Sequence, residues 1–165
     1  MYNVTIIGSH SVGKSSLWMQ WSGHQFCTSY CATIFVEKND ISPFAVYEIP
    51  AITRFVNNFD KYYDKTDIFV LVVNQDCGHL PLFEELAHKY REASWLLILN
   101  GSGKFPKCRS YANDMGLYMA CVDLKYSKGV TESFETLKEL SMLHKQRPEL
   151  LNLTDEVYSW LPTCY

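Results

Sequence analysis

Residues 8–16 read GSHSVGKSS, and their flanks give this stretch its structural meaning. The apolar residues 4–7 precede it, and a run compatible with a helix, residues 17–21, follows it. Leu17 and Trp21 lie one helical turn apart, which predicts that they share a buried helix face. The sequence therefore predicts a strand, a loop and a helix in direct succession.

The loop matches the pattern G-x-x-x-x-G-K-S of the phosphate-binding P-loop. Gly8 and Gly13 tolerate positive φ and let a phosphate approach the backbone. Lys14 is expected to reach the terminal phosphates, and the hydroxyl of Ser15 is expected to ligate Mg²⁺. The N-terminus of the following helix faces the same anion. The alternative, a glycine turn with an incidental lysine, requires strand, spacing, Lys-Ser pair and helix all to coincide.

Composition narrows the classes of protein to which such a loop can belong. The chain has 165 residues, enough for one domain, and its 15 basic and 18 acidic side chains give a net charge of −3. This balance argues against a nucleic-acid partner or an anionic membrane surface. The six cysteines show neither C-x-x-C pairs nor zinc spacing, and no signal peptide or apolar run of about 20 residues occurs. These features predict a cytoplasmic protein, and the sequence leaves open whether it is a piece of a longer chain.

Strand-like and helix-like patterns alternate along the chain. The expected elements are a hairpin of strands 34–36 and 44–47, a buried strand 68–73, a helix 82–91, a strand 95–99, a short helix 111–115 closed by Gly116, a strand 117–122, a helix from about Thr131 and, after an interruption at Pro148, a short helix 149–161. This alternation predicts a doubly wound α/β fold with a mostly parallel sheet of about five or six strands. Residues 1–147 form the expected domain, residues 148–165 form a short helix or tail, and the ligand is expected at the carboxyl ends of the strands.

The segment from the glycine-lysine-serine motif through residues 26–34, FCTSYCATI, resembles the Ras-like small GTPases, most closely the Rab branch. Further matches follow in family order at residues 54–55, 62–63, 68–73, 97–100, 116–118 and 130–134, so that the resemblance covers residues 3–145. It implies the small-GTPase architecture, binding of GTP or GDP with Mg²⁺, and a role in vesicle trafficking. It also implies a protein effector or regulator that binds the switch surface.

The resemblance assigns roles to three residues outside the loop. Thr33 would belong to the first switch and meet Mg²⁺ and the terminal phosphate, Tyr30 would close over the phosphates, and Phe26 would pack edge-on against the base. The alternative for both aromatic residues is an ordinary surface position. The predicted nucleotide-binding residues are Ser11, Val12, Gly13, Lys14, Ser15, Ser16, Phe26, Tyr30, Thr33, Asn100 and Lys125, of which Ser15 and Thr33 are also the predicted metal ligands.

The catalytic segment departs from the family pattern. The motif Asp-x-x-Gly-Gln appears here as EIPAI, residues 48–52. Glu48 remains a candidate for holding a Mg²⁺-bound water, but Ala51 replaces the glycine that meets the terminal phosphate. Ile52 has no polar atom with which to orient water. The sequence therefore predicts very slow or absent hydrolysis and assigns no catalytic residue. His10 would crowd an incoming arginine finger or is simply a solvated loop residue.

The base-recognition segments depart as well. The motif Asn-Lys-x-Asp reads NGSG at residues 100–103, without the carboxylate and the lysine that recognise guanine. The motif Ser-Ala-Lys reads Asp123-Leu124-Lys125, in which Asp123 is either a displaced acceptor or an acid that ends a strand. A site without its hydrogen-bonding partner stops discriminating. The sequence leaves open whether guanine is preferred over adenine.

Partner choice and anchoring do not follow from the resemblance. The hairpin between the switches is about eight residues shorter than in Rab proteins. Cys164 is a lone cysteine and Pro162 is fourth from the end, so no prenylation box or other membrane anchor is visible. Two functions remain: a slow or locked nucleotide switch, and a pseudo-GTPase that binds a partner without a nucleotide cycle. A P-loop kinase or ATPase is the weaker third, because no substrate lid or second carboxylate cluster is evident.

Overall fold

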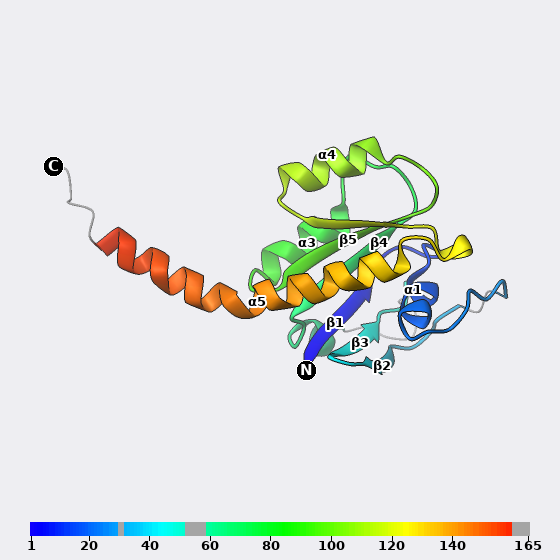
Figure 1. The fold of residues 1–165 in the computed structure, drawn as a ribbon, viewed down its shortest axis with the longest axis horizontal. Helices are drawn as coiled ribbons and strands as arrows, with labels where there is room; N and C mark the ends of the chain where they lie inside the picture. The colour runs from blue at the N-terminus through cyan, green and yellow to red at the C-terminus, as the bar shows by residue number, and fades with distance from the viewer. Residues whose placement is uncertain (30–31, 52–58, 160–165) are drawn as a thin grey trace.

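The computed structural model describes residues 1–29, 32–51 and 59–159, with backbone only over 147–159, and places helices on both faces of one six-stranded sheet (Figure 1). The elements in order are β1 Tyr2–Ile7, α1 Lys14–Trp21, β2 Glu37–Ile41, β3 Phe44–Glu48, α2 Asp60–Tyr63, β4 Ile68–Val73, α3 Pro81–Lys89, β5 Ser94–Asn100, α4 Pro106–Asp114, β6 Tyr118–Val122, the 3₁₀ turn η2 Leu124–Tyr126 and α5 Val130–Ser159.

The sheet is mixed but mostly parallel, with the strand order β2-β3-β1-β4-β5-β6. β1 pairs in parallel with β3 and β4, and β5 pairs in parallel with β4 and β6. The hairpin of β2 and β3 supplies the antiparallel edge. This arrangement confirms the predicted α/β class and brings the carboxyl ends of five strands to the same edge of the sheet.

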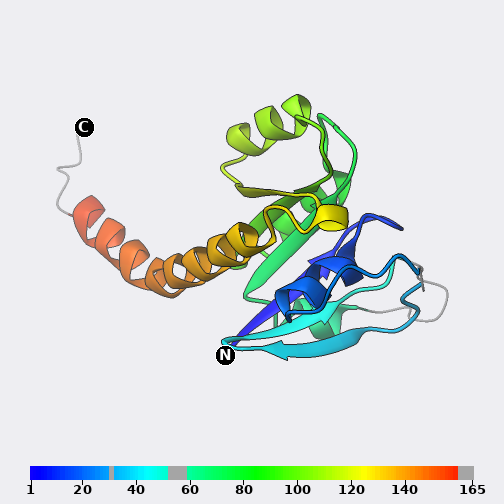
Figure 2. The same ribbon diagram turned by 45° about the vertical axis from the view of Figure 1, so that its right-hand side comes forward.

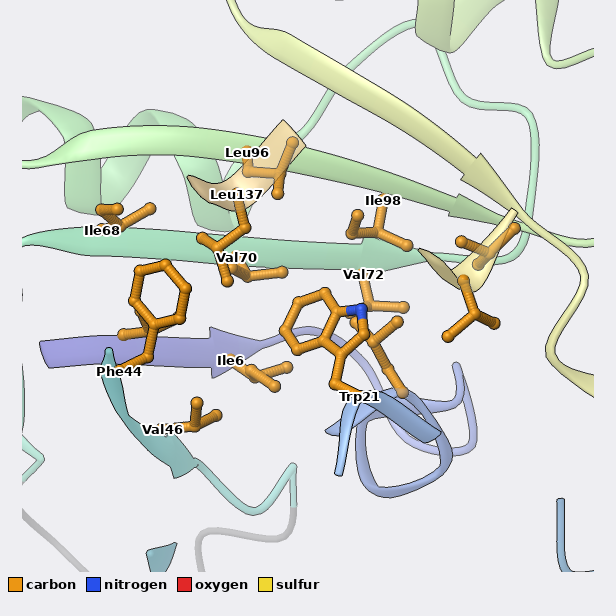
Figure 3. Close-up of a cluster of buried hydrophobic side chains, with 14 of the residues drawn as sticks. Ile6, Trp21, Phe44, Val46, Ile68, Val70, Val72, Leu96, Ile98 and Leu137 are labelled. Carbon is orange, nitrogen blue, oxygen red and sulfur yellow. The ribbon is translucent and has the colours of Figure 1, made fainter. Parts of the chain in front are cut away.

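The two faces of the sheet are buried against different helices, and β4 shows this most clearly. Ile68, Val70 and Val72 belong to the cluster under α1 and α5, where Trp21 and Leu137 gather over the sheet (Figure 3). Phe69 and Leu71 of β4 point to the opposite cluster, which packs under α3 and α4 and includes Phe83 and Ala112. Burial on both faces explains why this strand reads as an unbroken apolar run.

The first strand of the hairpin lies later in the chain than predicted. Residues 34–36 are not a strand, and Ile34 and Phe35 are 41% and 59% exposed. β2 instead has the mainly polar sequence EKNDI at residues 37–41. An edge strand need not bury an apolar face, so β2 shows little apolar pattern. The apolar residues 34–36 before it have a high strand propensity and therefore suggest a strand in the wrong place.

One helix differs from its expected start, and another lies where the sequence left loop and helix open. α4 begins at Pro106, five residues before the predicted start at residue 111, because proline suits the first turn of a helix. Its end is as predicted, since Gly116 has a φ of 65°. α2 occupies part of the ambiguous stretch after Pro50.

Pro148 does not interrupt the last helix, and this prediction is wrong. α5 continues from Val130 to Ser159, so the expected separate helix 149–161 is its second half as far as Ser159. Proline removes one backbone hydrogen bond and bends a helix without necessarily ending it. Figures 1 and 2 show that α5 bends and that its last part extends beyond the sheet. Across the described ranges, with their gaps, no helix combines the length and apolar character that crossing a membrane requires.

Alanine substitutions at Gly129 and Gly116 provide a matched test of close backbone packing. Both have positive φ, 71° and 65°, but a Cβ at Gly129 would overlap the backbone oxygen of Cys121, whereas one at Gly116 meets nothing within 4 Å. We expect Gly116→Ala to lower the free energy of unfolding by about 1–2 kcal/mol. Gly129→Ala should lower it by about 1–3 kcal/mol more in urea denaturation. Equal losses would contradict this packing.

Candidate functional site

A cavity of about 640 Å³ lies at the carboxyl ends of the parallel strands. Its walls come from the loop after β1, the start of α1, the segment before β2, and the ends of β3, β5 and β6. The predicted residues that line it are Ser11, Val12, Gly13, Lys14, Ser15, Ser16, Phe26, Thr33, Asn100 and Lys125. The structure thus brings together all the predicted residues it describes. Tyr30 lies outside the described residues.

The loop between β1 and α1 is compact and depends on its two glycines. Gly8, Ser11 and Gly13 have φ values of 147°, 58° and 102°. A Cβ on Gly8 would overlap the backbone oxygen of Val72, and one on Gly13 would lie 2.7 Å from the Asn100 side-chain nitrogen. Glycine is therefore required at both ends of the loop for its conformation and for its fit against β4 and β5.

Lys14 is only 6% exposed and folds back over this loop. Its Nζ donates to the carbonyl oxygens of Gly8 at 3.0 Å and Ser9 at 2.9 Å. Burial lowers the pKa of Lys14 from its ordinary value, and the nearby Glu48 carboxylate opposes this shift. α1 starts beside it without a side-chain cap and without an acidic residue in its first turn. A buried cation and a helix N-terminus on one cavity wall together favour an anion.

The Glu48 carboxylate is the centre of the polar network at the end of β3. It is 2% exposed and accepts hydrogen bonds from Ser15 Oγ at 2.8 Å and Thr33 Oγ1 at 3.1 Å, both on Oε1. Trp18 Nε1 donates to its other oxygen at 2.7 Å, and the Ser15 and Thr33 hydroxyl oxygens are 3.1 Å apart. Three separate segments, α1, β3 and the stretch before β2, therefore meet at one carboxylate.

The hydrogen bond from Trp18 to Glu48 was not predicted from the sequence. Ser15 and Trp18 are three residues apart in α1, which places them on one helix face, and this spacing is the signal that could have found it. Sequence reasoning assigned Glu48 only to a water-mediated role. The hydrogen bonds place its carboxylate directly beside both predicted metal ligands, Ser15 and Thr33.

A second carboxylate, that of Glu37, lines the cavity near this network. Glu37 lies opposite Glu48 in the β2–β3 pairing, and burial together with the Glu48 charge raises the pKa of Glu37. Within the part of the chain that the structure describes, no group of three or more His, Cys, Asp or Glu side chains could hold a metal ion. A cation at this position would therefore depend on the two hydroxyl oxygens and the Glu48 carboxylate.

At the other end of the cavity, Asn100 joins two loops. Its Nδ2 donates to Val12 O at 2.9 Å, and its Oδ1 accepts from the backbone N–H of Leu124 at 3.2 Å. Lys125 is exposed at the rim, with its Nζ 5.4 Å from the centre of the Tyr126 ring. Asp123 lines the same end and is partly exposed. Asn100 therefore holds the two loops together. Asp123 directly precedes Leu124, whose backbone N–H bonds to Asn100.

The glycines that follow Asn100 lie beside the ring of Phe105. Phe105 is 5% exposed with a φ of 48°, and its ring lies beneath this loop. A Cβ at Gly101 or Gly103 would lie 3.5 Å or 3.4 Å from the ring. Both distances are ordinary van der Waals contacts, so the ring leaves room for a Cβ, and it is the φ of 141° at Gly101 that favours glycine there.

The predicted catalytic segment is only partly described. Ala51 lines the cavity, whereas Ile52, the position of the family's catalytic glutamine, lies outside the described residues. His10 is exposed in the loop, and its Nδ1 lies 2.7 Å from Ser11 Oγ.

Comparison of the sequence with protein-family models gives no match, and comparison with curated proteins gives none either. The ligand of this cavity must therefore be inferred from its residues and their geometry.

The stability of the chain should depend on pH through Lys14. Because burial lowers its pKa, the unfolded chain binds this proton more tightly than the folded chain, and stability rises with pH between the lowered pKa and 10.5. Lys14→Met keeps the apolar stem and removes the titration. We expect the free energy of unfolding of the wild type, relative to this variant, to increase from neutral pH towards 10.5 in urea denaturation. A difference independent of pH would contradict the lowered pKa.

Proposed function

We propose that this chain is a divergent Rab-like small GTPase that binds a nucleoside di- or triphosphate with Mg²⁺ and acts by binding a protein partner, with very slow or no hydrolysis. The observation that carries the proposal is the convergence of Lys14, Ser15, Thr33 and Glu48 on one wall of the cavity. Their order, and the spacing from Lys14 and Ser15 to Thr33, are those that the Rab resemblance implies, whereas Glu48 follows a shorter hairpin.

The phosphate groups would lie against the loop of residues 8–13. The glycine-dependent loop conformation, the uncapped start of α1 and the buried charge of Lys14 all favour an anion at this place. A bound phosphate would also place a negative charge beside the buried Lys14, which otherwise interacts with the Glu48 carboxylate without a hydrogen bond. Phosphate binding therefore relieves the cost of burying Lys14.

The residues around Glu48 fit a Mg²⁺ ion. Ser15, Thr33 and Glu48 provide hydroxyl and carboxylate oxygens within hydrogen-bonding distance of one another, and Mg²⁺ prefers such ligands and completes its shell with water and phosphate oxygens. Mg²⁺ in such a site neutralises charge on the phosphates. Trp18 holds the second carboxylate oxygen and so orients Glu48 towards the two hydroxyls.

Hydrolysis requires a polar side chain that positions the attacking water. Ile52 stands at the family position for that side chain and is apolar, and Ala51 at the cavity wall carries a Cβ where the family has glycine. We therefore infer that the chain retains the binding groups for phosphate and Mg²⁺ without the group that promotes turnover.

Base preference remains open between guanine and adenine. Residues 101 and 103 are glycines that pack on Phe105, and they provide neither the lysine stem nor the carboxylate of the family. Asp123 lines the cavity beside Leu124, whose backbone is held by Asn100. Asp123 is the candidate acceptor for a base, and its alternative role is to end β6.

A protein partner is proposed at the segment that carries Thr33. Ile34 and Phe35 are 41% and 59% exposed immediately after it, and apolar side chains in such a position favour a protein effector or regulator. Because Thr33 is held by Glu48 and Ser15, the shape of this segment depends on the same network that would hold the ligand.

A pseudo-GTPase is the second candidate, and a specific observation favours it. Glu48 already satisfies the Ser15 and Thr33 hydroxyls, and the Gly8 and Ser9 carbonyls already accept from Lys14. The site is thus held together by hydrogen bonds within the chain. In this alternative, the surface near Thr33 binds its partner without a nucleotide cycle.

Titration with fluorescent GTP, GDP and ATP in the presence of Mg²⁺ tests the proposal. We expect saturable binding of at least one of them, weakened roughly 10- to 100-fold by Lys14→Ala, because a hydrogen-bonded charge is lost. Lys38→Ala is the matched control, since Lys38 pairs with Asp40 on β2 and does not line the cavity. No binding of any nucleotide would overturn the proposal in favour of the pseudo-GTPase. Equal binding by Lys14→Ala would show that the loop is not the phosphate site.

Hydrolysis is tested separately by the release of inorganic phosphate from a bound triphosphate. We expect no release above the rate without protein, because Ile52 cannot orient water. The measurement requires protein saturated with nucleotide, with a hydrolysing small GTPase in parallel as a positive control. A rate equal to that of the positive control would contradict the role assigned to Ile52.

A further inference from the structure

Cys77 and Cys108 lie together on the face of the sheet opposite α5. Their sulfur atoms are 3.5 Å apart although they are 31 residues apart in the sequence. Cys77 is in the loop after β4, Cys108 is in the first turn of α4, and the backbone N–H of Cys77 donates to Cys108 Sγ at 3.2 Å. Among the four cysteines that the structure describes, these two are within reach of each other.

Contacts other than the sulfurs fix this proximity. Asp76 Oδ1 accepts from the backbone N–H groups of Lys107 at 2.9 Å and Cys108 at 3.0 Å. It supplies the cap at the start of α4 that the preceding residue, Phe105, does not provide. Cys108 Sγ also donates to the carbonyl oxygen of Gln75 at 3.4 Å. The loop is therefore fastened to α4 at Gln75 and Asp76, the two residues directly before Cys77.

The two thiols differ in exposure and reactivity. Cys77 is partly exposed, whereas Cys108 has no exposed surface and packs in the core beneath α4. Burial raises the pKa of the Cys108 thiol to about 11. Since the thiolate is the nucleophile and exposure admits an oxidant, Cys77 is the thiol that reacts first and Cys108 the one that follows.

We propose that Cys77 and Cys108 form a reversible disulfide when the chain meets a hydroperoxide. The Cys77 thiolate attacks the peroxide oxygen, the O–O bond breaks, and Cys77 becomes a sulfenic acid while the other oxygen leaves as hydroxide. The Cys108 sulfur then attacks the sulfenic sulfur, an S–S bond forms, and the sulfenic hydroxyl leaves as water. Two thiols are oxidised and one hydrogen peroxide is reduced to two waters.

The link requires a small movement and has a defined place in the fold. The sulfurs must approach from 3.5 Å to about 2.0 Å, and the Cys108 hydrogen bond to Gln75 is lost because the sulfur no longer carries a proton. The loop that becomes cross-linked begins at Asn74, which lines the cavity. Oxidation therefore ties one side of the cavity rim to α4.

Peptide mapping of the full chain by mass spectrometry, without reduction, tests the proposal after limited treatment with hydrogen peroxide. We expect a linked pair of peptides containing Cys77 and Cys108, lacking two hydrogen atoms and separated by dithiothreitol. Cys121→Ser is the matched control, because Cys121 is an exposed cysteine in β6, and it should form the same link. Cys77→Ser and Cys108→Ser should not form it.

Trapping with dimedone tests the order of the steps. Cys108→Ser should accumulate sulfenic acid on Cys77, whereas the wild type should show little because Cys108 consumes it. Persistent trapping at Cys77 in the wild type, without a linked peptide, would overturn the proposal. Preferred pairing of either residue with another cysteine would also overturn it. If Cys108→Ser does not fold, the peptide maps of the wild type and of Cys77→Ser still test the link. Cys77→Ser changes only a partly exposed residue.

Discussion

The candidate site depends on the buried carboxylate of Glu48. A carboxylate at the end of a parallel strand is costly to bury unless its oxygens are paired. Here a hydroxyl and an indole N–H from α1, and a hydroxyl from the stretch before β2, pair them. Lys14 lies close enough for its pKa to respond to this charge. Removal of the carboxylate would leave three donors without their acceptor and would take away the negative charge near the buried Lys14, so the geometry of this wall depends on one side chain.

Much of the fold could be predicted because the spacing of apolar residues along the sequence indicates which side chains are buried. The run of residues 68–73 is apolar on both faces, and the structure buries both; Leu137 and Ser141 in the last helix follow the predicted stripe. The predictions fail where the apolar spacing is absent or where a local signal misleads. β2 is an edge strand with polar residues, so it has no apolar period to read. Pro148 has the local signature of a helix end, but a bent helix accommodates it.

The site was predictable where backbone geometry demands particular residues. Gly8 and Gly13 occupy positions that a Cβ does not fit, so the motif itself indicates the structure of the loop. The carboxylate network was less accessible, because Trp18 looks in sequence like any apolar helix residue and its N–H partner is 30 residues away. The position of Phe105 could not be foreseen either, because its ring comes to lie beside Gly101 and Gly103 only once the loop is folded.

The amide of Asn100 has a mechanical consequence for the cavity. It bonds Val12 in the loop after β1 and Leu124 in the turn after β6 at the same time, and both bonds come from one planar group. If either loop moves, its hydrogen bond to Asn100 must lengthen, or the amide must rotate and weaken its hydrogen bond to the other loop. The two ends of the cavity are therefore coupled, and a ligand that reaches only one end changes the shape of both.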